Sequence, residues 1–439
     1  MKKTRFALAL SIVLVAWPAS AQAQTARPTT GVALAPGANT TDRSAPFYID
    51  LAGLDMRTAP PTRDPKNPGY PNATELPDGT VPPKLATGNF IIGPSHKRAP
   101  ETVERTDVAK GRIETFTMSS SDSVIYKPGV VREERSLDAA TSSAAVAPGD
   151  PSNLLVSASR EGNWTRSVSV YIPAGHVRAR RAPFMVVGDG EFRGGGQLVT
   201  VLDNLIAARR IPPIVVIFVG SGGQDAQGSE RGREYDSVSG TYAAWVETEV
   251  LPAVERKVGI MLTRDPNGRA AMGGSSSGVA AFTMAWFRPD LYRRVLAFSP
   301  TFVNQQWPHD PALPGGAWEY HSAWPGPAQP GLSVRGFTGL AKSDAPAGSP
   351  LVPNSPRKPI RFWYAVGDRD LFYPVPAMVD GMHDWVLACE NMARALAAMR
   401  YQYQFVFARN AGHVDAATTA QTLPSALEWV WAGYPRPVE

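Results

Sequence analysis

The sequence predicts an α/β fold built on a mostly parallel sheet with helices on both faces. From about residue 112 onward, short apolar or β-branched segments alternate with segments of helical periodicity. Several of the short segments are apolar without alternation, which is typical of strands covered on both faces. Sites in such sheets form at the carboxyl ends of the strands, so reactive side chains are expected there.

Six segments are expected to be strands because they are short, β-branched or aromatic, and bounded by glycine or proline. They are 166–173, 182–188, 214–220, 294–300, 359–367 and 401–408. Three longer segments between them, 197–210, 241–257 and 384–399, carry apolar residues at helical spacing. A further short strand, turn and buried helix are expected across 268–287.

Three regions are expected along the chain. Residues 1–23 combine a basic start, an apolar stretch and small residues before a cleavage point after Ala23, which indicates a signal peptide and an exported, periplasmic or secreted protein. The apolar stretch is shorter than the roughly 20 residues of a membrane span, so we expect no stable membrane anchor. Residues 24–105 are rich in proline and predict an extended arm, and residues 106–439 predict the catalytic domain. A second break at 136–152 predicts a surface insertion.

Composition narrows the class of protein. Without residues 1–23 the chain has 41 basic and 39 acidic residues, and this balance gives no reason to expect nucleic-acid binding. Cys389 is the single cysteine, so an intramolecular disulfide and a cysteine metal site are excluded, and its helical context predicts buried packing. No H-E-x-x-H motif occurs, and we expect neither a metal nor another cofactor.

The stretch GGSSSG at 273–278 matches the G-x-S-x-G pattern of a nucleophile elbow, in which a serine sits on a sharp turn between a strand and a helix. Glycines flank such a serine because the turn leaves no room for side chains. The pattern begins at Gly274 and ends at Gly278, which makes Ser276 the expected nucleophile. In a chain rich in glycine and serine, the same pattern also fits a serine-rich loop.

A serine nucleophile needs a base and an acid, which in this type of fold follow it in the order Ser, Asp or Glu, His. His413 lies directly after the last expected strand, and Asp368 and Asp370 lie after the strand before it. We favour Asp370, because the turn carries it past the strand end towards the site, and leave Asp368 as the alternative.

The oxyanion of an acyl-transfer intermediate needs two donors aimed at it. With Ser276 as nucleophile, one donor is the amide of Ser277, and the other comes from the loop after the strand at 182–188, at Gly190 or Glu191. A flexible glycine turn is the alternative for that loop.

From about residue 111 to 437 the chain resembles the esterase D and enterochelin esterase group of α/β-hydrolases, relatives of feruloyl and acetylxylan esterases. The resemblance rests on VSVYIPAG, FMVVGDGEF, RGREYDSVSG, RAAMGGSSSGVAAF and QFVFARNAGH, together with the segments between them. In that group a large residue and then glycines follow the nucleophile. Here Ser277 and Gly278 follow Ser276, which leaves Ser275 open, but Ser275 lacks a glycine two positions later.

The resemblance implies a metal-free serine esterase and places Glu234 and Tyr235 near the substrate, unless they form an exposed loop salt bridge. The segment 303–327, rich in tryptophan, proline and histidine, is expected to cover the site. Trp307 and Trp318 in it are candidates for binding an aromatic or sugar group, unless they pack inside a cap.

The sequence therefore predicts an exported serine hydrolase that cleaves a small-molecule or saccharide ester through an acyl-enzyme. Two alternatives stay open. One is an acyltransferase that passes the acyl group to a sugar hydroxyl, and the other is a catalytically silent binding protein on the same fold.

Overall fold

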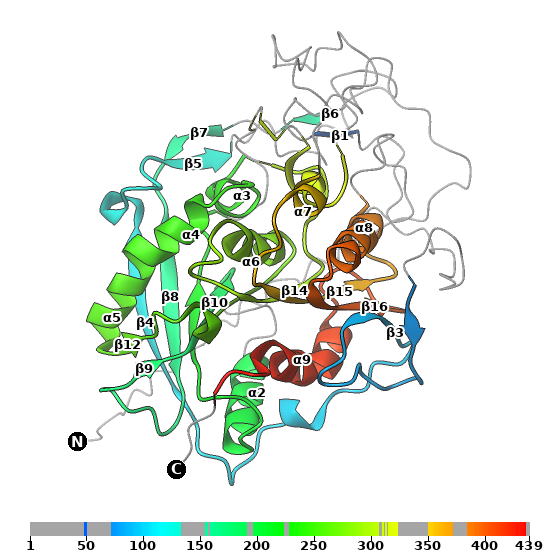
Figure 1. Cartoon of the computed structure of the whole chain (residues 1–439). Helices are drawn as coiled ribbons and strands as arrows, with labels where there is room; N and C mark the ends of the chain where they lie inside the picture. The colour runs from blue at the N-terminus through cyan, green and yellow to red at the C-terminus, as the bar shows by residue number, and fades with distance from the viewer. Residues whose placement is uncertain are drawn as a thin grey trace, which may run out of the picture.

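A computed structural model describes residues 48–50, 72–132, 154–156, 159–190, 196–223, 228–306, 310, 312–313, 315–323, 350–371 and 384–435. Its centre is a ten-stranded sheet with the order β2-β3-β16-β15-β14-β13-β10-β11-β8-β4 (Figure 1). Neighbouring strands run parallel from β2 to β11, and only β8 and β4 are antiparallel. This is an α/β-hydrolase fold, and the expected fold class is confirmed.

The strands form where apolar, β-branched and aromatic residues cluster, and the six expected ones are all present. The sheet consists of β2 (Thr74–Glu75), β3 (Gly88–Ile92), β4 (Arg112–Ser119), β8 (Thr165–Ile172), β10 (Phe184–Gly188), β11 (Val215–Val219), β13 (Arg269–Gly274), β14 (Arg294–Phe298), β15 (Arg361–Gly367) and β16 (Gln402–Ala408). Three small two-stranded sheets pair β1 (Tyr48–Asp50) with β6 (Leu154–Val156), β5 (Gly129–Arg132) with β7 (Ser159–Gly162), and β9 (Arg181–Ala182) with β12 (Met261–Leu262).

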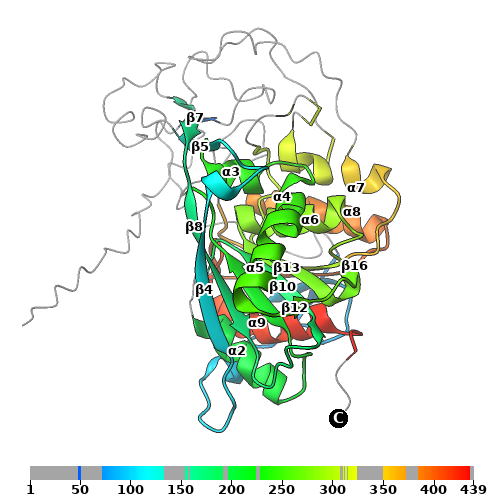
Figure 2. The same ribbon diagram turned by 90° about the vertical axis from the view of Figure 1, so that its left-hand side faces the viewer.

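Helices cover both faces of the sheet, as Figures 1 and 2 show. On one face α2 (Gly196–Ala207) and α9 (Ala416–Trp431) pack over one apolar cluster. On the other lie α3 (Glu230–Tyr235), α4 (Thr241–Trp245), α5 (Leu251–Val258), α6 (Ser276–Phe287) and α8 (Trp385–Ala398). The strands are buried on both sides because successive residues, such as Met185 and Val186, enter opposite clusters. Cys389 of α8 is fully buried, which confirms its expected packing role.

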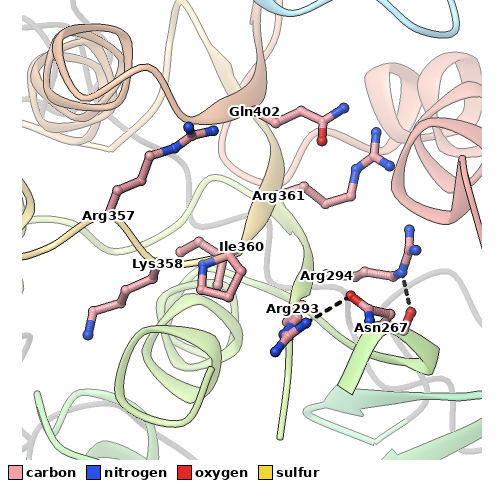
Figure 3. A pocket seen from close by; sticks show the side chains of 9 residues that line it. Asn267, Arg293, Arg294, Arg357, Lys358, Ile360, Arg361 and Gln402 are labelled. Atoms are coloured by element: carbon pink, nitrogen blue, oxygen red, sulfur yellow. Dashed lines mark hydrogen bonds between the residues drawn. The ribbon is translucent and has the colours of Figure 1, made fainter. Parts of the chain in front are cut away.

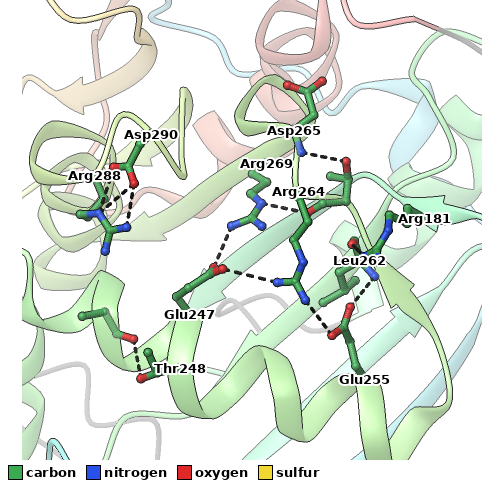
Figure 4. A network of polar contacts seen from close by, with 12 residues as sticks. Arg181, Glu247, Thr248, Glu255, Leu262, Arg264, Asp265, Arg269, Arg288 and Asp290 are labelled. Atoms are coloured by element: carbon green, nitrogen blue, oxygen red, sulfur yellow. Dashed lines mark hydrogen bonds and ion pairs between the residues drawn. The ribbon is translucent and has the colours of Figure 1, made fainter.

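The segment 241–257 is helical as expected, but a π-helical turn, η5 (Val246–Val250), joins α4 to α5. Pro252 follows this turn and has no N–H to donate to a carbonyl of the preceding turn, which disfavours a regular α-helix there. Glu247 of η5 forms an ion pair with the buried Arg269 at the start of β13, at 2.7 Å (Figure 4). Arg264 contacts both Glu247 and Glu255, so a network of paired charges ties this helix to the sheet.

The described part of the proline-rich arm extends the sheet. β3 pairs with β16 in parallel, and β2 pairs with β3. His96 contacts Gln421 of α9 and the carbonyl oxygen of Arg409, at 2.7 and 2.6 Å. Residues 72–105 therefore pack on the same core as the rest of the chain.

The expected signal peptide and the insertion at 136–152 lie outside the described residues. Among the helices that the structure describes, none has the length and apolar character of a membrane span.

Candidate active site

The turn between β13 and α6 holds a strained serine. Ser275 has φ 57° and ψ −126°, a region that non-glycine residues avoid and that is held only where the surroundings enforce it. Its N–H donates to the carbonyl of Phe298, and its own carbonyl accepts from Gly278 and Thr301, at 2.9, 2.9 and 3.2 Å. A strained serine between a strand and a helix is the geometry of a nucleophile elbow.

The strained turn lies one residue earlier than the sequence predicts, so the expectation that Ser276 occupies it is wrong. Ser276 is in the first turn of α6 and is only 1% exposed. Burial raises the pKa of Asp236 to about 6, although Arg231, Gln305 and Ser276 each lower it. Ser275, in contrast, is partly exposed, with Oγ 3.5 Å from Thr301 Oγ1.

Ser277 occupies the position where the pattern calls for a glycine, and this misled the sequence prediction. Its Oγ donates to the carbonyl of Gly274 and accepts from the N–H of the same residue, at 2.8 and 2.9 Å. Room for it comes from the next strand, because a Cβ on Gly188 would lie 2.6 Å from Ser277 Cβ. A Cβ on Gly273 would lie 2.3 Å from the Ser277 backbone. Glycines at 188 and 273 thus make the turn possible.

The structure brings Asp370 and His413 together. The parallel strands β15 and β16 end at the same edge of the sheet as β13, and the two side chains follow these ends. His413 Nδ1 lies 2.6 Å from Asp370 Oδ1, which also accepts the N–H of Leu371 at 2.7 Å. The Asp370 side chain is fully buried, whereas that of His413 is 23% exposed. The alternative acid, Asp368, accepts the N–H of Ala411 at 3.1 Å instead.

Ser299 is a part of the site that sequence reasoning missed. It is the first residue after β14, and its hydroxyl donates to Asp370 Oδ2 at 2.5 Å and accepts the N–H of Val414 at 2.9 Å. Its φ of 47° is unusual for a serine and turns the chain sharply at the strand end. A polar residue directly after a buried parallel strand was the available signal.

The loop after β10 differs from the expected oxyanion donor set. The N–H of Gly190 is already bonded to the carbonyl of Val219, at 2.8 Å, and therefore does not serve as a free donor. Glu191 lies outside the described residues. With Ser275 in the strained turn, the residue that follows it is Ser276 and not Ser277, so the Ser276 amide occupies the position that the pattern assigns to the first donor. Amides in the first turn of a helix have no partner within the helix.

Glu234 and Tyr235 do not face a substrate cleft, contrary to what the resemblance implies, because both are 1% exposed. Arg166 forms a bidentate ion pair with Glu234, with both side chains fully buried, and stacks over Trp164 at 3.8 Å. The Tyr235 hydroxyl accepts the N–H of Asp189 at 2.9 Å. The two residues thus support the loop after β10 from within the core.

Trp318 belongs to a packed cap. It lies in the short helix η7 (Gly316–Tyr320), is 7% exposed, and contacts the ring of His321 with centroids 4.8 Å apart. Burial lowers the pKa of His321 to about 4, so its ring is neutral at pH 7 and accounts for part of this apolar packing. Trp318 therefore offers little surface to a ligand. Trp307 lies outside the described residues.

An aromatic ring packs against the acid–base pair: Trp385, the first residue of α8, meets the ring of His413 edge to face, with centroids 5.8 Å apart. Trp385 is 3% exposed and thus acts as a wall behind the imidazole. Within the described ranges, no group of three or more His, Cys, Asp or Glu side chains is placed to hold a metal ion.

The model of the Esterase family matches residues 159–336, and no curated protein sequence matches the chain. Among solved structures, the enterobactin esterase of Shigella flexneri, in the presence of 2,3-dihydroxy-N-benzoyl-serine, is 19% identical, with a TM-score of 0.40 over 61% of this chain. A ferulic acid esterase of Anaeromyces mucronatus in complex with ferulic acid is 11% identical, with a TM-score of 0.45 over 76% of this chain and 96% of that one.

The chain spans 55% of the length of the Shigella esterase, and likeness at these levels says nothing about substrate. The family match covers the strand, elbow and helix described above, from β7 to the segment after η7. Residues 159–336, fewer than half of the 439 residues, are therefore similar to the Esterase family, and this segment lies within the α/β-hydrolase fold described above.

Proposed function

We propose that the protein is an exported serine hydrolase that cleaves carboxylic esters through an acyl-enzyme, with Ser275 as nucleophile, His413 as base and Asp370 as the acid that orients it. The observation that carries the proposal is the hydrogen bond between His413 Nδ1 and the buried Asp370, at the same end of the parallel strands as a strained serine on an elbow. The three residues follow the chain order of α/β-hydrolases.

A short segment connects the nucleophile turn to the acid–base pair. Ser299 bonds Asp370 through its hydroxyl, and two residues later the N–H of Thr301 bonds the carbonyl of Ser275. Because both contacts come from residues 299–301, the position of the carboxylate and that of the elbow are set by one piece of backbone.

The proton positions follow from these contacts. Asp370 accepts three hydrogen bonds, and one of them comes from the Nδ1–H group of His413. The other ring nitrogen, Nε2, therefore has a free lone pair and can act as a base. Ser275 Oγ attacks the ester carbonyl carbon while His413 Nε2 takes its proton, and the buried Asp370 charge stabilises the imidazolium. The N–H of Ser276 donates to the oxyanion.

Collapse of this intermediate breaks the bond to the alcohol oxygen, which receives the proton from His413 and leaves. Water then attacks the acyl-Ser275 carbonyl and gives its proton to His413. The free acid departs and Ser275 is regenerated. No step consumes a co-reactant other than water.

The substrate class and the location are part of the proposal. The resemblance to enterochelin and feruloyl esterases supports small-molecule or saccharide esters, and the character of residues 1–23 supports export. Hydrolysis of acetyl-sugar, feruloyl and catecholate esters by the purified protein ranks these substrates directly. Mass analysis with a sugar acceptor present decides between free acid and a transferred ester, the product of an acyltransferase.

A pair of adjacent substitutions tests the assignment. Ser275→Ala should lower the turnover of p-nitrophenyl acetate by about 10⁵-fold or more, as loss of a serine nucleophile does elsewhere. Ser276→Ala should stay within about tenfold of wild type, since its backbone N–H, not its hydroxyl, serves the oxyanion. Loss of activity in Ser276→Ala with retention in Ser275→Ala would overturn the assignment.

A further inference from the structure

A second candidate site lies at the amino ends of the parallel strands, whereas Ser275 lies at their carboxyl ends. Arg294, Arg361 and Gln402 are the first residues of β14, β15 and β16, and they are direct neighbours in register. They line a cavity of about 490 Å³ together with Arg293, Arg357 and Lys358 (Figure 3). The five residues of β14, at roughly 3.3 Å each, place this cavity about 15 Å or more from the carboxyl ends of the strands.

The cavity is lined by five cations and no carboxylate. The hydrogen bonds of its arginines go to neutral acceptors. Arg294 donates to the carbonyl oxygens of Asn267, Val430 and Ala432, and Arg361 donates to that of Ala432 at 2.6 Å. Arg293 donates to the side-chain oxygen of Asn267 at 3.3 Å. Within the described residues, none of the five cations forms an ion pair with a carboxylate.

Other arginines of the chain are paired instead. Arg264, Arg269 and Arg288 each contact a glutamate or aspartate, at 3.1, 2.7 and 2.7 Å (Figure 4). The arginines of the cavity differ from these three in having only neutral hydrogen-bond partners among the described residues.

Two of the cations lie at least partly buried without an ion-pair partner in the described part of the chain, although the more distant carboxylate of Asp265 acts on Arg294. Arg294 is 6% exposed, and the Nε of Arg361 is buried without a hydrogen-bond partner. Burial lowers the pKa of each to about 10, and the charge of Arg294 contributes to the shift at Arg361, so both are still cationic at pH 7. Unpaired buried cations cost stability, and an anion placed between them would offset that cost.

The guanidinium groups are also held in place. Arg361 lies over the ring of Trp429 at 4.4 Å, and Arg294 lies over Trp431 at 5.5 Å. Arginines that are fixed by stacking and by backbone carbonyls lose little side-chain freedom when an anion binds. Their planar guanidinium groups can donate two parallel hydrogen bonds to the oxygens of a phosphate.

We propose that this cavity binds a small organic anion that carries two or more phosphate groups. Five positive charges exceed what a single phosphate, with a charge of about −1.5 to −2 at pH 7, neutralises. The volume lies in the range of about 300–1,000 Å³ typical of small-molecule sites. The site is independent of ester cleavage at Ser275.

Calorimetric titration of the full chain tests the proposal, with tripolyphosphate as the probe and inorganic phosphate and acetate as comparisons, at about 50 mM NaCl to limit screening. Tripolyphosphate should bind at least about tenfold more tightly than inorganic phosphate, and acetate should not bind. Arg357→Gln combined with Lys358→Gln should weaken tripolyphosphate binding by about tenfold or more. Because these two side chains are partly or fully exposed, the fold and the turnover of p-nitrophenyl acetate should not change.

Arg264→Gln is the matched control, because Arg264 is an exposed arginine that is already paired with glutamates. It should change the affinity by less than about twofold. Arg294→Gln, if it folds, should abolish binding. Three results would overturn the proposal: no heat with wild type at about 1 mM tripolyphosphate, equal affinity for inorganic phosphate, or equal affinity in the Arg357/Lys358 double variant.

Discussion

Replacing Asp370 by asparagine isolates the contribution of its charge. Asp370 Oδ1 receives two N–H groups, from His413 and Leu371, whereas Oδ2 receives the hydroxyl of Ser299. An asparagine should keep its oxygen at the Oδ1 position, because an NH₂ group there would face two donors. The NH₂ then faces Ser299 Oγ, whose hydroxyl can turn to accept. Asp370→Asn should therefore keep the His413 tautomer and remove mainly the negative charge.

The size of the effect follows from the geometry. The Nδ1–Oδ1 distance of 2.6 Å places the two charge centres about 4 Å apart, and at an effective dielectric constant of about 20 their attraction is about 4 kcal/mol. At about 1.4 kcal/mol per tenfold, kcat should fall by about 10³-fold. A fall nearer 10⁴-fold would show that the asparagine also fixes the wrong tautomer, as in a serine protease triad.

The assay is steady-state hydrolysis of p-nitrophenyl acetate, with the melting temperature measured in parallel. Asp368→Asn is the control, because an asparagine oxygen there still accepts the N–H of Ala411, and kcat should change by less than about tenfold. A crippled Asp368→Asn beside an active Asp370→Asn would refute the reasoning.

Three further substitutions test interactions that stabilise the site or the fold. Ser299→Ala removes a hydrogen bond to a charged carboxylate, worth about 1.5–3 kcal/mol, and should lower kcat by roughly 10- to 100-fold with KM little changed. Glu230→Gln should raise the melting temperature at pH 8 but not at pH 4.5. Burial raises the folded-state pKa of Glu230 from 4.5 to about 7, so the wild type loses up to about 3 kcal/mol of stability as the pH rises through this window. Gly188→Ala should lower the free energy of unfolding by about 1–3 kcal/mol in denaturant, because the new Cβ would lie 2.6 Å from Ser277 Cβ. Adding Ser277→Gly to the same chain should restore part of that free energy. If the effects of the two substitutions simply add, the predicted collision is contradicted.

The sheet and the acid–base pair could be predicted from the sequence because both depend on local signals. Apolar runs without alternation mark buried parallel strands, and in such a sheet all carboxyl ends meet at one edge. Asp370 and His413 each follow a strand end, so their encounter follows from topology once the strands are known.

The register of the elbow could not be predicted, because three adjacent serines differ only in backbone conformation and in what surrounds them. The space for Ser277 is provided by Gly188, a residue of another strand that lies far away in the sequence. The burial of Glu234 likewise depends on its ion pair with Arg166, which lies 68 residues earlier in the sequence. No local pattern near Glu234 indicates this buried ion pair.

The most direct test of the account is to find which serine reacts with a fluorophosphonate probe. The wild-type protein is labelled in its folded state and digested, and the modified peptide from 270–286 is sequenced by mass spectrometry. The adduct should sit on Ser275, and labelling should disappear in His413→Ala, since the hydroxyl then lacks its base. An adduct on Ser276 or Ser277, or a folded protein that takes up no label, would contradict the assignment.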